Sequence, residues 1–225
     1  MATKKENVAI ELPRLDVQMM EITLIGDAPL IVHAWSVKSK REMLAKQTKA
    51  PKGPKSAKDP KKDFEESMYR LADGGYGFPS VAFKAAAITA VTSVSGVTKV
   101  AARQAFHVVG EGVDQGGAFE GVQMRQNLAR IEGSKPRMRE DMVRVGLGTA
   151  DLRYRAEFWP WWSTILVRFN GSLLSTAQIL NLFNYAGFGC GIGEWRPERD
   201  GENGMFHVAT EAEIKALSKP KRRAA

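Results

Sequence analysis

The sequence predicts an α+β protein with a ferredoxin-like core that carries large insertions. Three observations predict this class: strand-like segments near both ends of the chain, an Ala-rich helical segment, and a second helical segment with clear capping residues. The predicted order is strand, long insertion, helices, strands, helix and strand. A chain of 225 residues that is 44% hydrophobic can bury a core, which excludes a wholly disordered protein and favours one domain over residues 1–225.

The first half of the chain supplies one strand and two helices. Residues 19–26 alternate well enough for a strand and lead into a second apolar stretch over 27–36. A glycine and proline cluster at 74–79 predicts a turn. The Ala-rich residues 80–94 predict a helix with Ser80 as its N-cap, and residues 98–108 predict a second helix.

The second half supplies most of the sheet. Residues 110–121 contain five glycines and predict a loop, and residues 122–148 predict a hairpin arm around the turn at 133–136. Alternation predicts strands at 151–158 and 163–171. Ser175 caps the clearest helix, 175–187, whose apolar face contains Ile179, Leu182, Phe183 and Ala186. A glycine loop, a strand at 204–209 and a C-terminal helix and basic tail over 210–225 follow, with Thr210 and Glu213 as a capping box.

The net charge of +8 is concentrated in one insertion. Residues 38–62 hold ten basic and two acidic residues (10 − 2 = +8), so the rest of the chain is neutral. Its prolines and lack of apolar residues predict a mobile segment after a helical first half. A cationic insertion suits a polyanion, and a solvated loop is the alternative. The basic residues we expect to bind nucleic acid here are Lys38, Lys40, Arg41, Lys46, Lys49, Lys52, Lys55 and Lys58.

Two motifs go beyond composition. In Phe78 to Ala86 a turn opens a helix, and such an N-terminus, with Ser80 and an early Lys84, is suited to an anion. In Gly187 to Pro197 alternate glycines, including Gly189, Gly191 and Gly193, precede Arg196 and let backbone approach a ligand or another backbone segment. A tight connection is the alternative for the second motif.

Together these motifs resemble the RAMP superfamily, whose members include the backbone subunits of CRISPR effector complexes. Its first helix opens with a Pro-Gly-Ser-Ser-aliphatic-Lys-Gly turn. Here Pro79, Phe83 and Lys84 keep the spacing, while Ser80 replaces the family's glycine and the serines are absent. The family's glycine loop and last strand after the closing helix correspond to Gly187–Gly193 and Gly204–Val208, with Met205 and His207 as departures. The resemblance covers about residues 19–30, 76–95 and 150–209.

The resemblance implies a modified RNA-recognition-motif core, binding of single-stranded RNA or DNA, and side-by-side, head-to-tail assembly as a homo-oligomer or with other subunits of a ribonucleoprotein complex. Basic residues on strand-like segments fit this expectation independently: Arg137, Arg139, Arg153 and Arg155. Alternation places Arg153 and Arg155 on one face of their strand. Ion pairs with Glu140, Asp141 and Glu157 are the alternative role for these arginines.

Three tryptophans surround Pro160: Trp159, Trp161 and Trp162. The candidates for the contact between subunits are Trp161 and Trp162. Adjacent tryptophans cannot all face one core, and an exposed Trp marks an interface or a base-stacking surface.

The sequence predicts no catalytic residue, no metal site and no cofactor. His33, His107 and His207 are far apart, no nucleophile or paired-carboxylate motif accompanies them, and Cys190 is expected to be a packing residue. Some members of the resembling family cut RNA near the position of Asp27 and His33, so an endoribonuclease of the same fold is one alternative function.

A second alternative is a virion or assembly protein that neutralises nucleic acid, and the style of the sequence is also similar to that of bacteriophage proteins. The chain has no apolar run of membrane-spanning length and no secretion signal, and its single cysteine forms no internal disulfide. We therefore expect a protein of the bacterial cytoplasm, encoded by the bacterium or by a phage, with no membrane partner.

Overall fold

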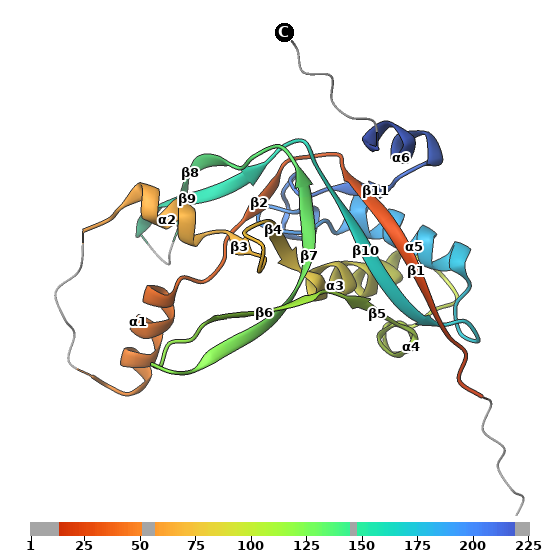
Figure 1. Ribbon diagram of the computed structural model, residues 1–225, viewed down its shortest axis with the longest axis horizontal. Coiled ribbons are helices and arrows are strands. Elements are labelled where there is room, and N and C mark those ends of the chain that lie inside the picture. Colours follow the sequence, from red (N-terminus) through yellow and green to blue (C-terminus); the bar gives the residue numbers. More distant parts are fainter. Residues whose placement is uncertain (1–13, 51–56, 145–147, 219–225) are drawn as a thin grey trace, which may run out of the picture.

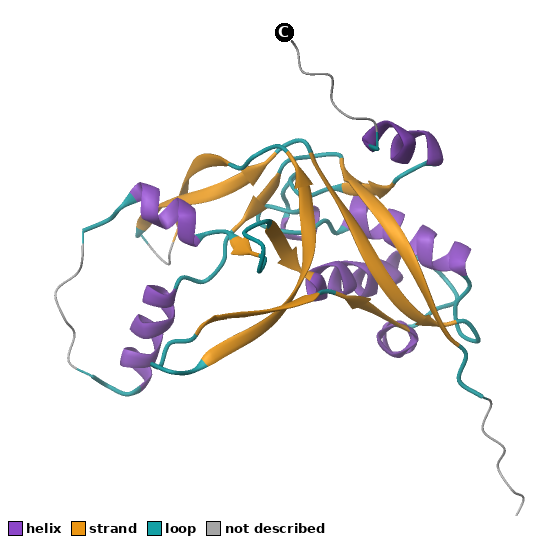
Figure 2. Cartoon of the chain, viewed as in Figure 1, coloured by secondary structure: helices purple, strands orange, loops and turns teal. Residues whose placement is uncertain are grey.

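The structure, a computed structural model, describes residues 14–50, 57–144 and 148–218. Within these ranges the chain is an α+β protein with six α-helices and two antiparallel sheets (Figures 1 and 2). The predicted α+β class is therefore confirmed. No helix in the described ranges has the length and apolar character needed to cross a membrane.

The larger sheet has eight strands in the hydrogen-bonded order β11-β1-β10-β7-β4-β3, with β5 beside β10 and β6 beside β7. Its strands are β1 (Val17–Gly26), β3 (Tyr69–Arg70), β4 (Tyr76–Pro79), β5 (Phe106–Val109), β6 (Glu111–Gly116), β7 (Gln123–Gly133), β10 (Trp161–Asn170) and β11 (Phe206–Val208). The smaller sheet has the order β2-β9-β8, with β2 (Leu30–Val32), β8 (Arg137–Arg144) and β9 (Ala150–Phe158).

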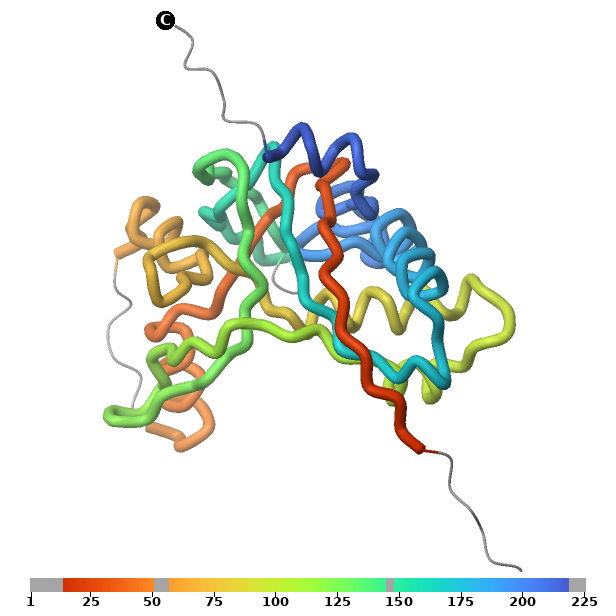
Figure 3. The backbone as a smooth tube through the Cα atoms, turned by 45° about the vertical axis from the view of Figure 1, so that its right-hand side comes forward, coloured from red at the N-terminus to blue at the C-terminus, as the bar shows by residue number. Residues whose placement is uncertain are grey.

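The helices differ in how they relate to these sheets. They are α1 (Val37–Gln47), α2 (Pro60–Glu66), α3 (Ser80–Ala90), α4 (Lys99–Ala105), α5 (Thr176–Gly189) and α6 (Glu211–Leu217), with short 3-10 turns at Val91–Ser93 and Pro197–Arg199. Figures 1 and 3 show α3 and α5 together on one face of the larger sheet, with α1 far from them.

The main core lies between the larger sheet and the helices α3 and α5. Strand β10 alternates strictly, with Ile165, Val167 and Phe169 buried under the helices and the intervening residues on the opposite face. The predicted capping box of α6 is present. In α5 the predicted apolar face is buried and Ser175 caps the helix as predicted, although the helix continues to Gly189 rather than ending at Gly187.

Five local predictions were wrong. Ser80 does not cap α3: Pro79 is the N-cap, no side chain caps the helix, and Ser80 is buried. The turn predicted at 74–79 contains β4, the helix predicted at 98–108 is α4 followed by β5, and the loop predicted at 110–121 contains β6.

The fifth error concerns the arm predicted at 122–148. Strands β7 and β8 exist there, but β8 pairs with β9 and β7 pairs with β4, β6 and β10. The hairpin is instead formed by β6 and the half of β7 from Gln123 to Leu128, which we call the β6–β7 arm. In Figure 1 this arm extends from the sheet to α1.

Candidate nucleic-acid interface

Helix α1 carries the first half of the basic insertion. Ser36 starts the helix, because its hydroxyl accepts a hydrogen bond from the backbone N–H of Ser39 at 3.0 Å. No residue of α1 is buried. Four basic side chains of this region are exposed and lie within 4.0 Å of no acidic group in the described part of the chain: Lys38, Arg41, Lys46 and Lys49.

The helix is held to the β6–β7 arm by a few contacts. Lys40 donates from Nζ to the carbonyl oxygen of Gly116 at 2.9 Å. A Cβ on Gly116 would lie 2.9 Å from a methyl of Val37, so the glycine permits close approach of helix and arm. Lys40 therefore has a structural role in the fold as well as a place in the predicted basic set.

A largely apolar cavity of about 370 Å³ separates α1 from the arm. Trp35, with more than half of its surface exposed, forms one side, and Lys40 lies at the edge. Met43 from α1 and Met124 from β7 face the same space. The arrangement places an exposed indole beside an unneutralised basic helix.

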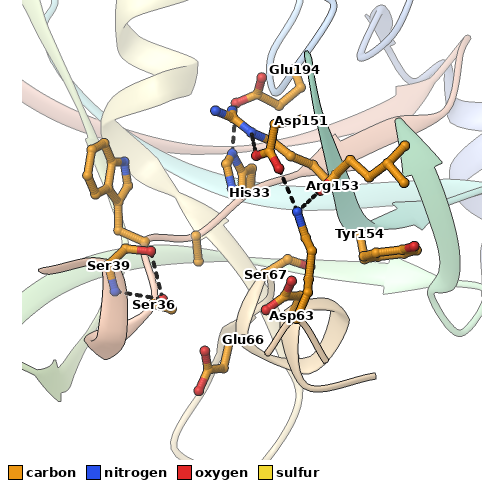
Figure 4. Close-up of a pocket in the computed structure, with 14 residues that line it drawn as sticks. His33, Ser36, Ser39, Asp63, Glu66, Ser67, Asp151, Arg153, Tyr154 and Glu194 are labelled. Carbon is orange, nitrogen blue, oxygen red and sulfur yellow. Dashed lines mark hydrogen bonds and ion pairs between the residues drawn. The ribbon is translucent and has the colours of Figure 1, made fainter. Parts of the chain in front are cut away.

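The end of the basic insertion lies in a second cavity, of about 440 Å³, which Figure 4 shows. Lys58 donates to Asp151 Oδ1 at 2.7 Å and to the backbone oxygen of Leu152. Arg153 Nε lies 3.6 Å from the other oxygen of Asp151. Lys58 is thus bound to β9. Lys52 and Lys55 lie outside the described residues, as does the segment that was predicted to be mobile.

The arginines of β8 and β9 form ion pairs with neighbouring carboxylates. Arg139 bonds Asp141 at 2.8 Å and Glu157 at 3.0 Å, and Arg137 lies 3.8 Å from Glu157. These hydrogen bonds, first of all the one that Asp141 accepts, raise the pKa of Arg139. Pairing was the alternative role considered for this group.

Arg155 departs furthest from the predicted exposed position, since only 2% of it is exposed. Its Nη1 donates to Asp141 at 3.2 Å, and its Nη2 lies 3.5 Å from Glu194. A nucleic-acid contact by this side chain would require the fold to open, so the prediction for Arg155 was wrong.

The start of α3 does not present the predicted anion site. Only 4% of Ser80 is exposed, so its hydroxyl is not available to a ligand at the surface. Lys84 extends away from the helix N-terminus and donates from Nζ to the carbonyl oxygen of Arg103 at 3.0 Å. Ser80 is therefore a packing residue, whereas Lys84 belongs to a different part of the surface.

The glycine loop after α5 packs against the protein's own backbone. Gly191 and Gly193 have φ angles of +64° and +81°, and a Cβ on Gly193 would lie 2.6 Å from the carbonyl oxygen of Ile31. Arg196 donates to Glu198 and to the carbonyl oxygen of Gly193. Gly189 ends α5, and a Cβ at this position would extend into open space. These contacts explain Gly191 and Gly193 as a tight connection.

The loop brings Glu194 beside His33, a pairing that the sequence analysis missed. His33 Nδ1 lies 3.8 Å from Glu194 Oε1 (Figure 4). His33, followed by Arg155, lowers the pKa of Glu194 despite partial burial. The two residues line both the second cavity and a third, of about 320 Å³, between α3 and the glycine loop. Only a long-range contact joins them, so no local sequence signal exists.

The tryptophans around Pro160 have distinct environments. Trp161 is 1% exposed and donates to the carbonyl oxygen of Ala28 at 2.8 Å, so it is a core residue and the prediction of a subunit contact there was wrong. Trp162 lies on the opposite face of β10 and donates to Glu132 at 2.9 Å. Trp159 is the exposed member, at 37%.

Asp27, the acidic residue near His33 in sequence, does not contact it. Asp27 instead bonds His207 at 2.6 Å. In the described ranges, no three His, Cys, Asp or Glu side chains lie close enough together to hold a metal ion.

Comparison of the sequence with models of protein families and with curated proteins finds no match.

Proposed function

We propose that the protein binds single-stranded nucleic acid and assembles side by side along the strand, as a RAMP-like backbone subunit or a phage single-strand binding or recombination factor. The observation that carries the proposal is the unneutralised positive charge of α1 and of Lys49, two residues beyond its end. Most other candidate arginines are engaged by carboxylates, but Lys38, Arg41, Lys46 and Lys49 are exposed, with no acidic group within 4.0 Å in the described ranges. Phosphates that replace the counterions of such a helix supply binding free energy.

The order of elements supports a ferredoxin-like core for this function. Strands β11, β1, β10 and β7 are consecutive in the larger sheet, and each neighbouring pair is antiparallel. Helix α3 lies between β1 and β7 in sequence, and α5 between β10 and β11. A βαββαβ chain with the spatial order 4-1-3-2 has this arrangement, with the basic insertion and the β6–β7 arm as additions.

The cavity beside α1 supports single strands over duplex. An unpaired base has a free π-face that stacks on an exposed aromatic ring, at about 1–3 kcal/mol per base. Trp35 offers such a ring next to Lys40 and the exposed cations of α1. In a duplex the bases are already stacked on one another, so no base face is free to stack on the Trp35 ring.

Fluorescence anisotropy with labelled oligonucleotides tests the proposal. We expect single-stranded RNA or DNA to bind more tightly than a duplex of equal length, and Trp35→Ala to reduce that preference while Trp159→Ala leaves it unchanged. Equal affinity for duplex and single strand would favour the virion or assembly protein instead. Sedimentation with a long single strand should give species heavier than a one-to-one complex, and a protein that stays monomeric there would contradict side-by-side assembly.

An endoribonuclease is a second candidate because of the His33–Glu194 pair. A carboxylate beside an imidazole orients the ring, which is the arrangement that general acid–base catalysis uses. Lys58 and Arg153 line the same cavity and offer positive charge to a phosphate. Incubation of labelled RNA with the wild type and, separately, with His33→Gln tests this candidate. Cleavage by the wild type but not by the variant supports an endoribonuclease. Intact RNA in both reactions rejects it.

A further inference from the structure

Three basic side chains from three elements lie together at the edge of the larger sheet. Lys84, from α3, has its Nζ 3.2 Å from Nδ1 of His107 on β5. His107 is the direct cross-strand partner of Arg168 on β10. Residues opposite each other in antiparallel strands have Cβ atoms about 4.5–5.5 Å apart on one face. We call Lys84, His107 and Arg168 the sheet-edge cluster.

The cluster opens on the face of the sheet that α3 and α5 do not cover. Figure 1 shows both helices behind β1 and β10. The buried residues of β10 are Ile165, Val167 and Phe169, on the face that the helices cover. His107 and Arg168 alternate with those buried residues and are exposed. Lys84 reaches them around β5, with its Nζ 6.0 Å from the centre of the Phe106 ring.

No acidic side chain neutralises the cluster within the described ranges. None of its three members has a carboxylate within 4.0 Å there. The acidic residue nearest in the strand register is Glu21 on β1, which faces Leu166 rather than Arg168. From α4, Arg103 contributes a backbone carbonyl to Lys84, not a negative charge.

The environment of His107 disfavours its protonated form. Burial, then Lys84 and Arg168, lower its pKa, and burial lowers the pKa of Lys84. With the imidazole neutral, Nδ1 accepts from the Lys84 ammonium and the ring proton resides on Nε2. The Nε2–H, the remaining donor capacity of Lys84 and the guanidinium of Arg168 are then left for a ligand.

We propose that the sheet-edge cluster binds a phosphate group. An anion there would offset the positive charges of Lys84 and Arg168 and would favour protonation of His107. A phosphate accepts two parallel bonds from the Arg168 guanidinium and further bonds from Lys84 and from His107. The phosphate belongs either to a nucleic-acid backbone, in which case the inference rests on the proposed function, or to a small phosphorylated ligand.

The titration of His107, followed by NMR of the histidine ring protons, tests this proposal directly. A bound anion favours the protonated imidazole, so it should raise the pKa of His107. The two probes are sulfate, at constant ionic strength, and a short single-stranded oligothymidylate. His207 reports on non-specific effects in the same spectra, and its pKa should not follow that of His107.

Arg168→Gln is the main variant, because Arg168 is exposed and its loss does not threaten the fold. It should abolish the response of His107 and weaken binding of the responding probe about tenfold or more. Lys215→Gln, on α6, removes the same charge from another exposed site and should change neither. Lys84→Met provides a second test, with circular dichroism to verify its folding.

The two probes separate the sources of the phosphate. A response to the oligonucleotide, with or without sulfate, assigns the site to a nucleic-acid backbone. A response to sulfate alone assigns it to a small phosphorylated ligand. If neither probe moves the pKa of His107, the proposal is overturned. If the oligonucleotide binds wild type and Arg168→Gln equally while His107 does not respond, this inference fails and the proposed function stands.

Discussion

Arg155 and Asp141 form an ion pair inside the smaller sheet, with Nη1 and Oδ2 3.2 Å apart and both side chains buried. Arg139 bonds the same carboxylate from the surface at 2.8 Å, and Glu194 approaches Arg155 from the glycine loop at 3.5 Å. The charges of β8, β9 and the loop are therefore organised around one buried guanidinium. These strands present less free positive charge than their sequence indicates.

Asp141→Ala should destabilise the protein by about 3 kcal/mol. Loss of one partner from a buried pair costs roughly 3–5 kcal/mol, and Glu194 remains near Arg155, which favours the lower end. Urea denaturation measures the change. As a control, Asp151→Ala removes a partly exposed partner of Lys58 from the same sheet and should cost about 1 kcal/mol or less. Equal effects of the two substitutions would contradict a structural role for the Arg155–Asp141 pair.

His207 should stabilise the protein most at low pH. Burial alone lowers the pKa of His207, but Asp27 and Glu213 together outweigh burial and raise it. Glu213 remains ionised in mild acid, because bonds from Thr210 and then His207 lower its pKa to about 2. A raised histidine pKa stabilises the folded state below the unfolded value of about 6.5, and this stabilisation is lost as pH rises through the folded value.

Thermal unfolding of wild type and His207→Gln across this pH range checks the sign. The difference in stability between the two proteins should be largest below about pH 6.5 and should shrink as the imidazole loses its proton. A difference that grows with pH would mean that the neutral ring makes the important contacts.

Cys190 should be inert to thiol reagents in the folded protein. The residue is buried at the end of α5, and burial, followed by Glu198, raises the pKa of its thiol. The thiolate is the reactive form, so both its access and its population are low. We expect a colorimetric thiol assay to show reaction only as urea unfolds the protein. Rapid reaction of the native protein would contradict the packing role.

The elements that the sequence predicted correctly are those whose patterns come from burial. Strands β1 and β10 alternate because helices cover one face of the sheet, and α5 combines a capping Ser175 with an apolar stripe. The first half of the basic insertion is helical as predicted. In each case the pattern of apolar, polar and capping residues lies within the element that it predicts.

The elements that were missed depend on long-range pairing. Strand β6 is glycine-rich and mostly exposed, and its backbone hydrogen bonds to β7 hold it in place. The turn at Gly133 joins two strands of different sheets, which sequence proximity cannot distinguish from a hairpin.

The same limit applies to the candidate site. Alternation places Arg153 and Arg155 on one face of β9, but it does not show that Asp141 and Glu194 enclose Arg155. The exposed cations of α1, by contrast, follow from composition, because nothing in that segment can be buried.

The salt dependence of single-strand binding tests the central claim, that the free charge of α1 binds phosphates. The variant replaces Lys38, Arg41, Lys46 and Lys49 with Gln, and the control replaces Arg137 and Arg139, which form ion pairs with carboxylates on β8 and β9. Each lost phosphate contact reduces the slope of log affinity against log salt by about 0.7 for single strands, so four contacts reduce it by about 2.8. We predict that fall for the α1 variant at unchanged stability, with little change in the control. An α1 variant with the slope of the wild type would contradict the account.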